Sequence, residues 1–127
     1  MTGTIAPRPP DNPLVYVAGP LSGTHLKYIQ NLHRMLMEAE FVSGLGLTPF
    51  IPGVDFLFAV FIVSGSGLQQ QLYGMSAAIL RRLNPERDCI YVYAYSPGVR
   101  MELELAKELG IPIMRSRAEL KAYAASR

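Results

Sequence analysis

The residues best arranged for chemistry in this chain are a serine, a glycine and a glutamate at fixed spacing, Ser96-x-Gly98-x-x-x-Glu102. Residues 89–93 are β-branched and aromatic, which predicts a buried strand, and the Ser-Pro-Gly turn ends it. The amphipathic helix that follows is expected to carry Glu102 in its first turn. Ligands of open α/β sheets bind beyond the carboxyl ends of the strands, so Glu102 is a candidate catalytic carboxylate. The alternative is that this acid only complements the helix macrodipole.

A second candidate binding segment is a glycine-containing loop early in the chain. It consists of Gly19, Pro20, Leu21, Ser22 and Gly23. Backbone amides in such a loop before a helix form an anion site, and a serine hydroxyl adds a donor, so a phosphate or ribose would fit. The sequence matches neither the dinucleotide fingerprint nor the P-loop, so an ordinary strand-to-helix turn is an equally simple interpretation.

The elements that must position these loops alternate along the chain. Strands are expected at residues 14–18, 47–52, 89–93 and 111–114, and helices at about 25–40, at 68–83, around Glu102 as far as Gly110, and at 119–125. This alternation predicts one α/β domain, residues 14–127, with a small doubly wound parallel sheet, flavodoxin- or Rossmann-like, and helices on both faces.

Two segments are less regular. Residues 1–13 contain four prolines and are expected to form a loose N-terminal tail without the pattern of a secretory signal. The apolar run at residues 56–63 has no clear period, so it can be a core element or a subunit interface. Its eight residues are too few for a membrane-spanning helix, which needs roughly 20.

Composition narrows the classes of function. The net charge is +2 over 127 residues and the basic side chains are scattered, so a polymeric nucleic-acid partner is not expected. The single cysteine, Cys89, falls in a predicted buried strand, which suits a reducing cytoplasm. The histidines His25 and His33 have no neighbouring cysteine or carboxylate at metal-ligand spacing, so neither a metal nor another cofactor is expected.

The order of several short motifs resembles the nucleoside 2-deoxyribosyltransferase-like family, over roughly residues 14–115. The most specific motif is Ser96-x-Gly98-x-x-x-Glu102, followed by leucine and alanine. The others are the sequences at residues 15–23, 49–52 and 110–113, and Asp88 before a strand. The serine at position 96 points to the branch of nucleoside 5′-monophosphate N-glycosidases.

The resemblance implies a role for each matching residue. Glu102 would attack the anomeric carbon of a nucleotide, form a glycosyl ester and release the base, after which water or a second base resolves the ester. Ser96 would bind the 5′-phosphate, because a hydroxyl donates to a phosphate and a carboxylate repels it. The loop at residues 19–23 would help to hold the sugar and the phosphate. Gly98, in the loop at residues 96–98, would also contact the substrate. Hydrolysis is the primary hypothesis, and deoxyribosyl transfer or nucleotide binding without chemistry are the alternatives.

Three positions qualify the resemblance. The family has a second catalytic aspartate about where Ser76 lies, and the chain has no carboxylate between Asp55 and Glu86. Arg100 stands where relatives have a small residue, and it can bind phosphate, pair with a glutamate or face solvent. Ser116 is a match for a serine that a neighbouring subunit supplies to the phosphate site. The resemblance therefore implies a homodimer.

Overall fold

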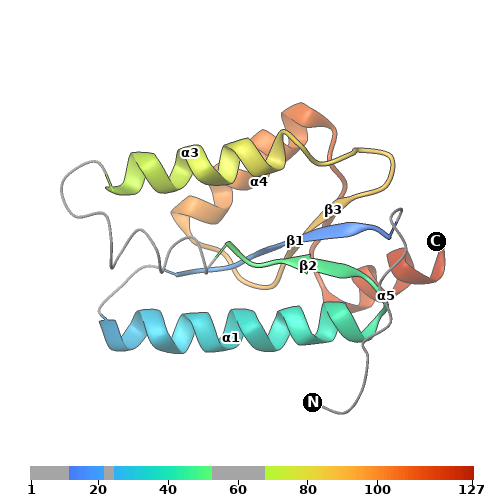
Figure 1. Cartoon of the computed structure of the whole chain (residues 1–127), viewed down its shortest axis with the longest axis horizontal. Helices are drawn as coiled ribbons and strands as arrows, with labels where there is room; N and C mark the ends of the chain where they lie inside the picture. Colours follow the sequence, from blue (N-terminus) through green and yellow to red (C-terminus); the bar gives the residue numbers. More distant parts are fainter. Residues whose placement is uncertain (1–11, 22–24, 53–67) are drawn as a thin grey trace, which may run out of the picture.

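The computed structural model describes residues 12–21, 25–52 and 68–127, and these form a four-stranded, all-parallel sheet in the order β2-β1-β3-β4 (Figure 1). The strands are β1 (Leu14–Ala18), β2 (Thr48–Phe50), β3 (Cys89–Val92) and β4 (Ile113–Met114). The helices are α1 (His25–Gly44), α3 (Leu68–Leu80), α4 (Pro97–Leu109) and α5 (Arg117–Ala125). The predicted doubly wound α/β class is confirmed.

Two apolar layers hold the helices to opposite faces of the sheet. Side chains alternate along each strand, so Tyr16 and Ile90 face α3 and α4, whereas Val17 and Tyr91 face α1 and α5. Figure 1 shows the same division, with α3 and α4 above the sheet and α1 and α5 below it. Both faces of the central strands are therefore buried, as their continuous apolar sequences require.

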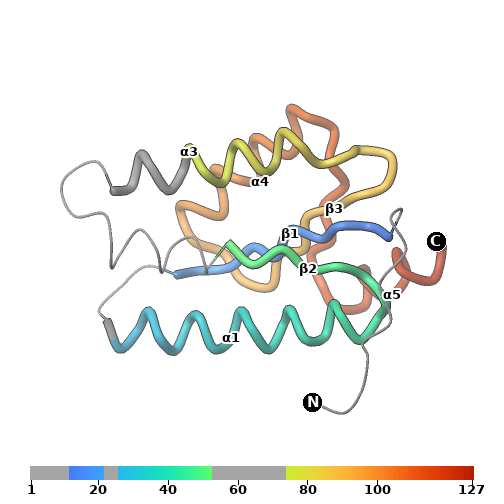
Figure 2. Tube along the Cα trace, viewed as in Figure 1, coloured from blue at the N-terminus to red at the C-terminus, as the bar shows by residue number. Residues whose placement is uncertain are grey.

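The winding of the chain gives the sheet a topological switch point. From β1 the chain passes through α1 to β2 on one side, and β3 then pairs with the other side of β1 (Figure 2). The strand order therefore reverses between β1 and β3. In open parallel sheets this switch point, at the carboxyl ends of the strands, is where ligands bind.

Several boundaries differ from those predicted. Helix α1 runs to Gly44, and Gly46 takes the left-handed conformation with φ 84°. Helix α3 ends at Leu80. The backbone N–H groups of Arg82 and Leu83 bond to carbonyls three residues earlier, in place of the four-residue spacing of an α-helix. Helix α5 begins at Arg117 and not at residue 119, since Ser116 caps it. Residues 1–11 of the expected tail and the apolar run 56–63 lie outside the described part of the chain.

An ion pair between the buried Glu38 and the exposed Arg117, together with Tyr91, links α1, β3 and α5. Both oxygens of Glu38 accept bonds from Arg117, at 3.1 and 3.0 Å, and the Tyr91 hydroxyl donates to Oε1 at 2.6 Å. Burial raises the pKa of Glu38, but the bonds from Arg117 and Tyr91 outweigh it and the net pKa is lowered. The pair therefore stabilises the fold at neutral pH, and this contribution is lost as the pH falls through the lowered pKa.

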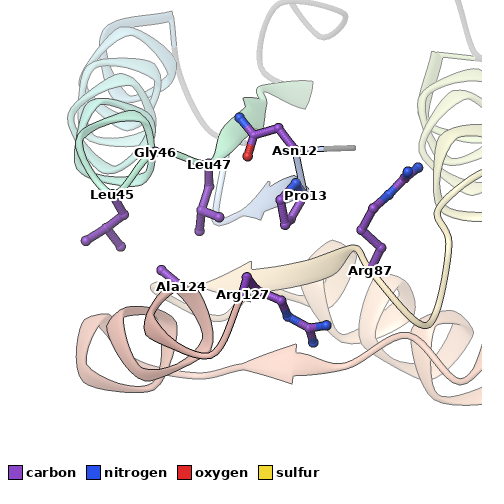
Figure 3. Close-up of a pocket in the computed structure, with 8 residues that line it drawn as sticks. All are labelled: Asn12, Pro13, Leu45, Gly46, Leu47, Arg87, Ala124 and Arg127. Carbon is purple, nitrogen blue, oxygen red and sulfur yellow. The ribbon is translucent and has the colours of Figure 1, made fainter. Parts of the chain in front are cut away.

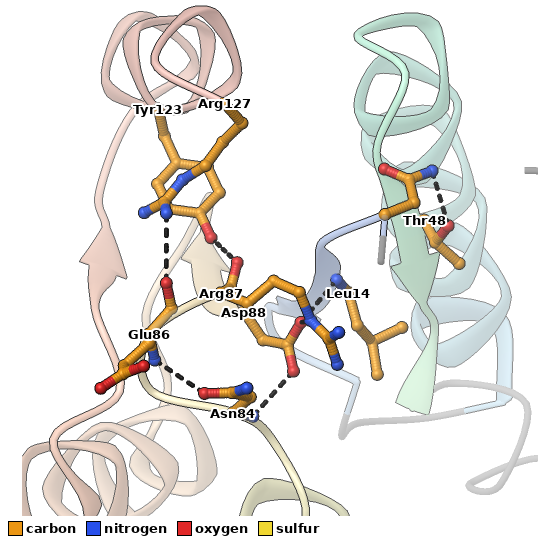
Figure 4. A network of polar contacts seen from close by, with 9 residues as sticks. Leu14, Thr48, Asn84, Glu86, Arg87, Asp88, Tyr123 and Arg127 are labelled. Carbon is orange, nitrogen blue, oxygen red and sulfur yellow. Dashed lines mark hydrogen bonds and ion pairs between the residues drawn. The ribbon is translucent and has the colours of Figure 1, made fainter. Parts of the chain in front are cut away.

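Asp88 joins the amino ends of the two central strands. Its carboxylate accepts the backbone N–H of Leu14 at 2.9 Å and that of Asn84 at 2.7 Å (Figure 4). Asp88 is 3% exposed, so these two donors replace water around its charge. The aspartate that precedes β3 therefore has a structural role at the edge opposite the switch point.

Gly19, directly after β1, is in close contact with the ring of Tyr93. A Cβ atom added at Gly19 would overlap the Cζ and hydroxyl atoms of Tyr93. The ring is also held from α1, where the Arg34 guanidinium lies 5.0 Å from its centroid. Glycine is thus required here by packing, and not by an unusual backbone angle.

We expect Gly19→Ala to lower the free energy of unfolding by about 1 to 3 kcal/mol, the usual cost of overpacking. Gly74→Ala is the matched control, because an added Cβ at Gly74 meets nothing within 4 Å. It lies inside α3, where alanine is the better helix former, so the control should be neutral or stabilised. Chemical denaturation of both variants measures the difference, and equal stabilities would contradict the packing role of Gly19.

Candidate active site

Glu102 lies in the second turn of α4 and its side chain is bonded to the centre of the sheet. The helix begins at Pro97, because Ser96 caps it and proline suits its first position. Its first turn contains no acidic residue, so the expected first-turn position of Glu102 is wrong. The macrodipole acts mainly within the terminal turn, so it does not explain this glutamate.

Two hydroxyl groups hold the Glu102 carboxylate. The Tyr16 hydroxyl, from the middle of β1, donates to Oε2. Ser76, from α3, forms a second side-chain hydrogen bond to Glu102. Three elements that are distant in sequence therefore meet at this carboxylate, between the sheet and the helix pair α3 and α4.

The environment of Glu102 changes its acidity. Burial raises the pKa of the carboxyl to about 7, and the hydrogen bonds from Tyr16 and Ser76 oppose the rise. Burial is the larger effect because removal of water penalises the charged form more than two neutral hydroxyls favour it. Near pH 7 the group is thus divided between acid and carboxylate, which is typical of catalytic carboxyls.

Ser76 is brought to the place where the sequence resemblance expects a second acid. Its hydroxyl bonds to Glu102, but a serine hydroxyl does not ionise near pH 7 and cannot replace a general acid. The other carboxylates considered for that role lie elsewhere. Asp88 is engaged at the opposite edge, Glu104 is exposed on α4, and Asp55 lies outside the described residues.

Ser96 and Gly98 form the turn that opens α4. The Ser96 hydroxyl oxygen accepts the backbone N–H of Val99 at 3.2 Å, which leaves its own hydrogen available to a ligand. A Cβ at Gly98 would meet only the Ser96 Oγ atom, at 3.9 Å, so packing does not require glycine there. The bare backbone instead leaves the space beside the Ser96 hydroxyl open.

The first loop is only partly described. Gly19 has the packing role given above, while Pro20 and Leu21 are half-buried. Ser22 and Gly23, which carry the expected hydroxyl and second glycine, lie outside the described residues. The Tyr93 hydroxyl, beside this loop, is buried without a hydrogen-bond partner among the described residues.

Ser116 and Arg100 are not in contact with Glu102 by any described bond. Ser116 is exposed and caps α5, where its hydroxyl oxygen accepts the N–H of Glu119 at 3.1 Å. Arg100 is exposed on α4, which agrees with the solvent-facing alternative. Neither residue therefore completes the site within one chain.

Tyr16 is not among the candidate site residues predicted from the sequence. In the sequence it reads as an ordinary β-former in the run from Leu14 to Ala18. A usable signal was present, because a tyrosine on a fully buried strand needs a partner for its hydroxyl. The exposed fraction of Tyr16 is 0%, and that partner is Glu102.

A cleft of about 520 Å³ lies at the opposite, amino-terminal edge of the sheet (Figure 3). It is lined by Arg87 and Arg127, and by Asn12, Pro13, Leu45, Gly46, Leu47 and Ala124. Both arginines are engaged, since Arg87 lies 3.5 Å from an Asp88 oxygen and Arg127 donates to the Glu86 carbonyl at 3.1 Å (Figure 4). The cleft also adjoins the C-terminal ends of α1 and α5, whose partial negative charge disfavours an anion. It is a poor match for a nucleotide.

Comparison of the chain with family models, curated proteins and solved structures gave no match. Within residues 12–21, 25–52 and 68–127, no group of three or more metal-ligating side chains is gathered. No helix in this part of the chain is long and apolar enough to cross a membrane.

We expect the stability of the protein to depend on the protonation of Glu102. Since its folded-state pKa is raised to about 7 from an ordinary 4.5, the wild type should lose stability as the pH rises from about 4.5 to 7. Glu102→Gln removes this penalty and should be more stable than the wild type at pH 8, by about 1 to 3 kcal/mol, but not at pH 4.

Urea unfolding at several pH values measures this difference. Glu104→Gln is the control, because Glu104 is exposed on the same helix. A wild type and Glu102→Gln variant with parallel pH profiles would show that Glu102 is not held in the described environment.

Proposed function

We propose that this protein hydrolyses the N-glycosidic bond of a nucleoside 5′-monophosphate, with Glu102 as the nucleophile. The observation that carries the proposal is a carboxylate held by Tyr16 and Ser76 near the switch point of a parallel sheet. Fold alone does not determine chemistry, so the argument rests on this side chain and on the turn beside it.

The proposed reaction has two steps. In the first, a carboxylate oxygen of Glu102 bonds to C1′ of the sugar as the bond from C1′ to the base nitrogen breaks, and the base takes a proton from water. In the second, water attacks C1′, releases the Glu102 carboxylate and loses a proton to solvent. If a second base attacks in place of water, the product is a new nucleoside or nucleotide, and the protein is a transferase.

The residues around Glu102 have distinct tasks in this scheme. Tyr16 holds Oε2 and fixes the direction of the carboxylate. Partial burial removes water that would otherwise compete with the sugar and weaken the interaction with oxocarbenium-like charge. Ser96, at the start of α4, offers its hydroxyl hydrogen to the phosphate, and Gly98 keeps that approach open.

A second candidate function is nucleotide binding without turnover. The observation that favours it is Ser76, because it contacts Glu102 where a general acid would be useful and cannot supply a proton near pH 7. The two candidates share the binding site and differ only in whether base is released.

We expect the wild type to release free base from at least one member of a panel of ribo- and deoxyribonucleoside 5′-monophosphates. Glu102→Gln should reduce the rate by roughly 10³-fold or more while it still binds the nucleotide, because it keeps the shape and loses the nucleophile. Chromatography of the products with and without an added second base separates hydrolysis from transfer. Binding by the wild type without base release would support the non-catalytic candidate.

The pH dependence of the same assay tests the nucleophile. Since the carboxylate is the active form and its pKa is raised to about 7, kcat/KM should rise with pH through that region. Tyr16→Phe removes a bond that lowers the pKa, so the rise should move to higher pH. A rise that stays in place in Tyr16→Phe would contradict the assigned role of Tyr16.

The proposal also includes a homodimer located in the cytoplasm. Large apolar side chains are exposed along α1, where Leu26 is 69% exposed and Ile29 53% exposed, with Leu36 and Met37 further along the same helix. Exposed apolar stretches of this kind favour protein contacts.

Light scattering on purified protein should give twice the chain mass, and Ile29→Glu with Met37→Glu should reduce it to the chain mass. Glu104→Lys serves as the surface control, because it changes an exposed charge on α4. A chain mass for the wild type across micromolar concentrations would reject the dimer.

A further inference from the structure

The described loops at the carboxyl ends of the four strands contain one charged side chain, that of Arg115. These loop residues are Gly19, Pro20, Leu21, Ile51, Pro52, Tyr93, Ala94, Tyr95, Ser96, Arg115 and Ser116. The edge that the sheet topology assigns to ligand binding therefore has a local positive charge from Arg115.

Arg115 is held in place from two sides. Its guanidinium Nη1 donates to the Tyr95 hydroxyl at 2.8 Å, and its backbone N–H donates to Glu119 Oε1 at 2.9 Å. Tyr95 directly precedes Ser96, the cap of α4, so the guanidinium bonds to a side chain of the loop that leads into this helix. The side chain therefore joins the loop after β4 to the loop after β3, at the carboxyl ends of these two strands.

The charge of Arg115 is not neutralised by an ion pair within the described residues. The ion pairs found there join Arg87 to Asp88 and Arg117 to Glu38. Glu119 is near, but its Oε1 atom accepts the backbone N–H of Arg115, which places it at the start of α5. The Tyr95 hydroxyl accepts one of the five N–H groups of the guanidinium, which therefore keeps donors for an anion.

We propose that Arg115, positioned by Tyr95, binds the phosphate of the substrate and sets the preference for a nucleoside monophosphate over a nucleoside. This inference rests on the proposed function and names the residue that selects its substrate. A guanidinium is suited to this task because it donates two parallel bonds to phosphate oxygens and is always charged. Ser96 would donate the neutral bond and Arg115 the charged ones, from adjacent loops.

The test compares nucleotide with nucleoside in both binding and turnover. Calorimetry measures the dissociation constants of a 5′-monophosphate and of its nucleoside, and base release from each gives kcat/KM. Arg115→Gln should weaken nucleotide binding and lower kcat/KM for the nucleotide roughly 10- to 100-fold, because hydrogen bonds to charged groups are lost. The values for the nucleoside should change by less than about twofold, since it has no phosphate.

Three further variants sharpen the result. Arg115→Lys keeps the charge and loses the paired donors, so it should recover part of the affinity. Tyr95→Phe should weaken nucleotide binding by a smaller factor, because it frees the guanidinium without removing it. Arg100→Gln is the matched control, since it removes an exposed arginine from α4 and should leave the ratio of nucleotide to nucleoside unchanged.

The outcomes separate the two proposals. If the wild type binds the nucleotide more tightly than the nucleoside and Arg115→Gln abolishes the difference, the role of Arg115 is supported even when no base is released. If Arg115→Gln leaves the ratio within twofold, or Arg100→Gln lowers it equally, the role of Arg115 is wrong although Glu102 can still be catalytic. A folded wild type that binds neither ligand overturns both.

Discussion

A carboxylate between a helix and a sheet needs hydrogen-bond donors from its neighbours, because little water is there to solvate it. In this protein the need for donors links a strand and two helices. Glu102 meets it through Tyr16 on β1 and Ser76 on α3. These contacts link α4 to β1 and to α3, beside the apolar cluster that packs both helices on the sheet. Even so, burial outweighs both donors, and the pKa of Glu102 rises to about 7. The environment of Glu102 is therefore unfavourable for its charged form. Perturbed pKa values of this kind are more often found at functional sites than at structural ones.

Much of the fold could be predicted from the sequence because the signals are local. The β-branched run of Leu14 to Ala18 and the left-handed Gly110, with φ 74°, gave a strand and a helix end that the structure confirms. Glu102 lies one turn later in α4 than the apolar spacing predicts, because Ser96 caps the helix and Pro97 begins it. Helix starts depend on such caps more than on apolar spacing.

Only part of the candidate site could be predicted from the sequence, because some of its contacts join residues that are far apart in the chain. Spacing within one segment identified Ser96 and Glu102, but the contact of Glu102 with Tyr16 joins residues 86 positions apart. A tyrosine on a buried strand needs a partner for its hydroxyl, but the local sequence does not identify which residue supplies it. Gly19 was likewise predicted only as a binding residue, and its packing against the Tyr93 ring depends on a residue far away in the sequence.

The contact between Gly19 and Tyr93 has a consequence for how sequences of this type can diverge. The ring of Tyr93 fills the volume that a side chain at position 19 would need, so neither residue can be exchanged freely while the other stays. A smaller residue at 93 would leave a void, and a larger one at 19 would displace the ring. The two positions are therefore expected to coevolve, so that a substitution at one is accompanied by a compensating change at the other. The loop after β1 and the end of β3, although distant in the gene, would evolve as one.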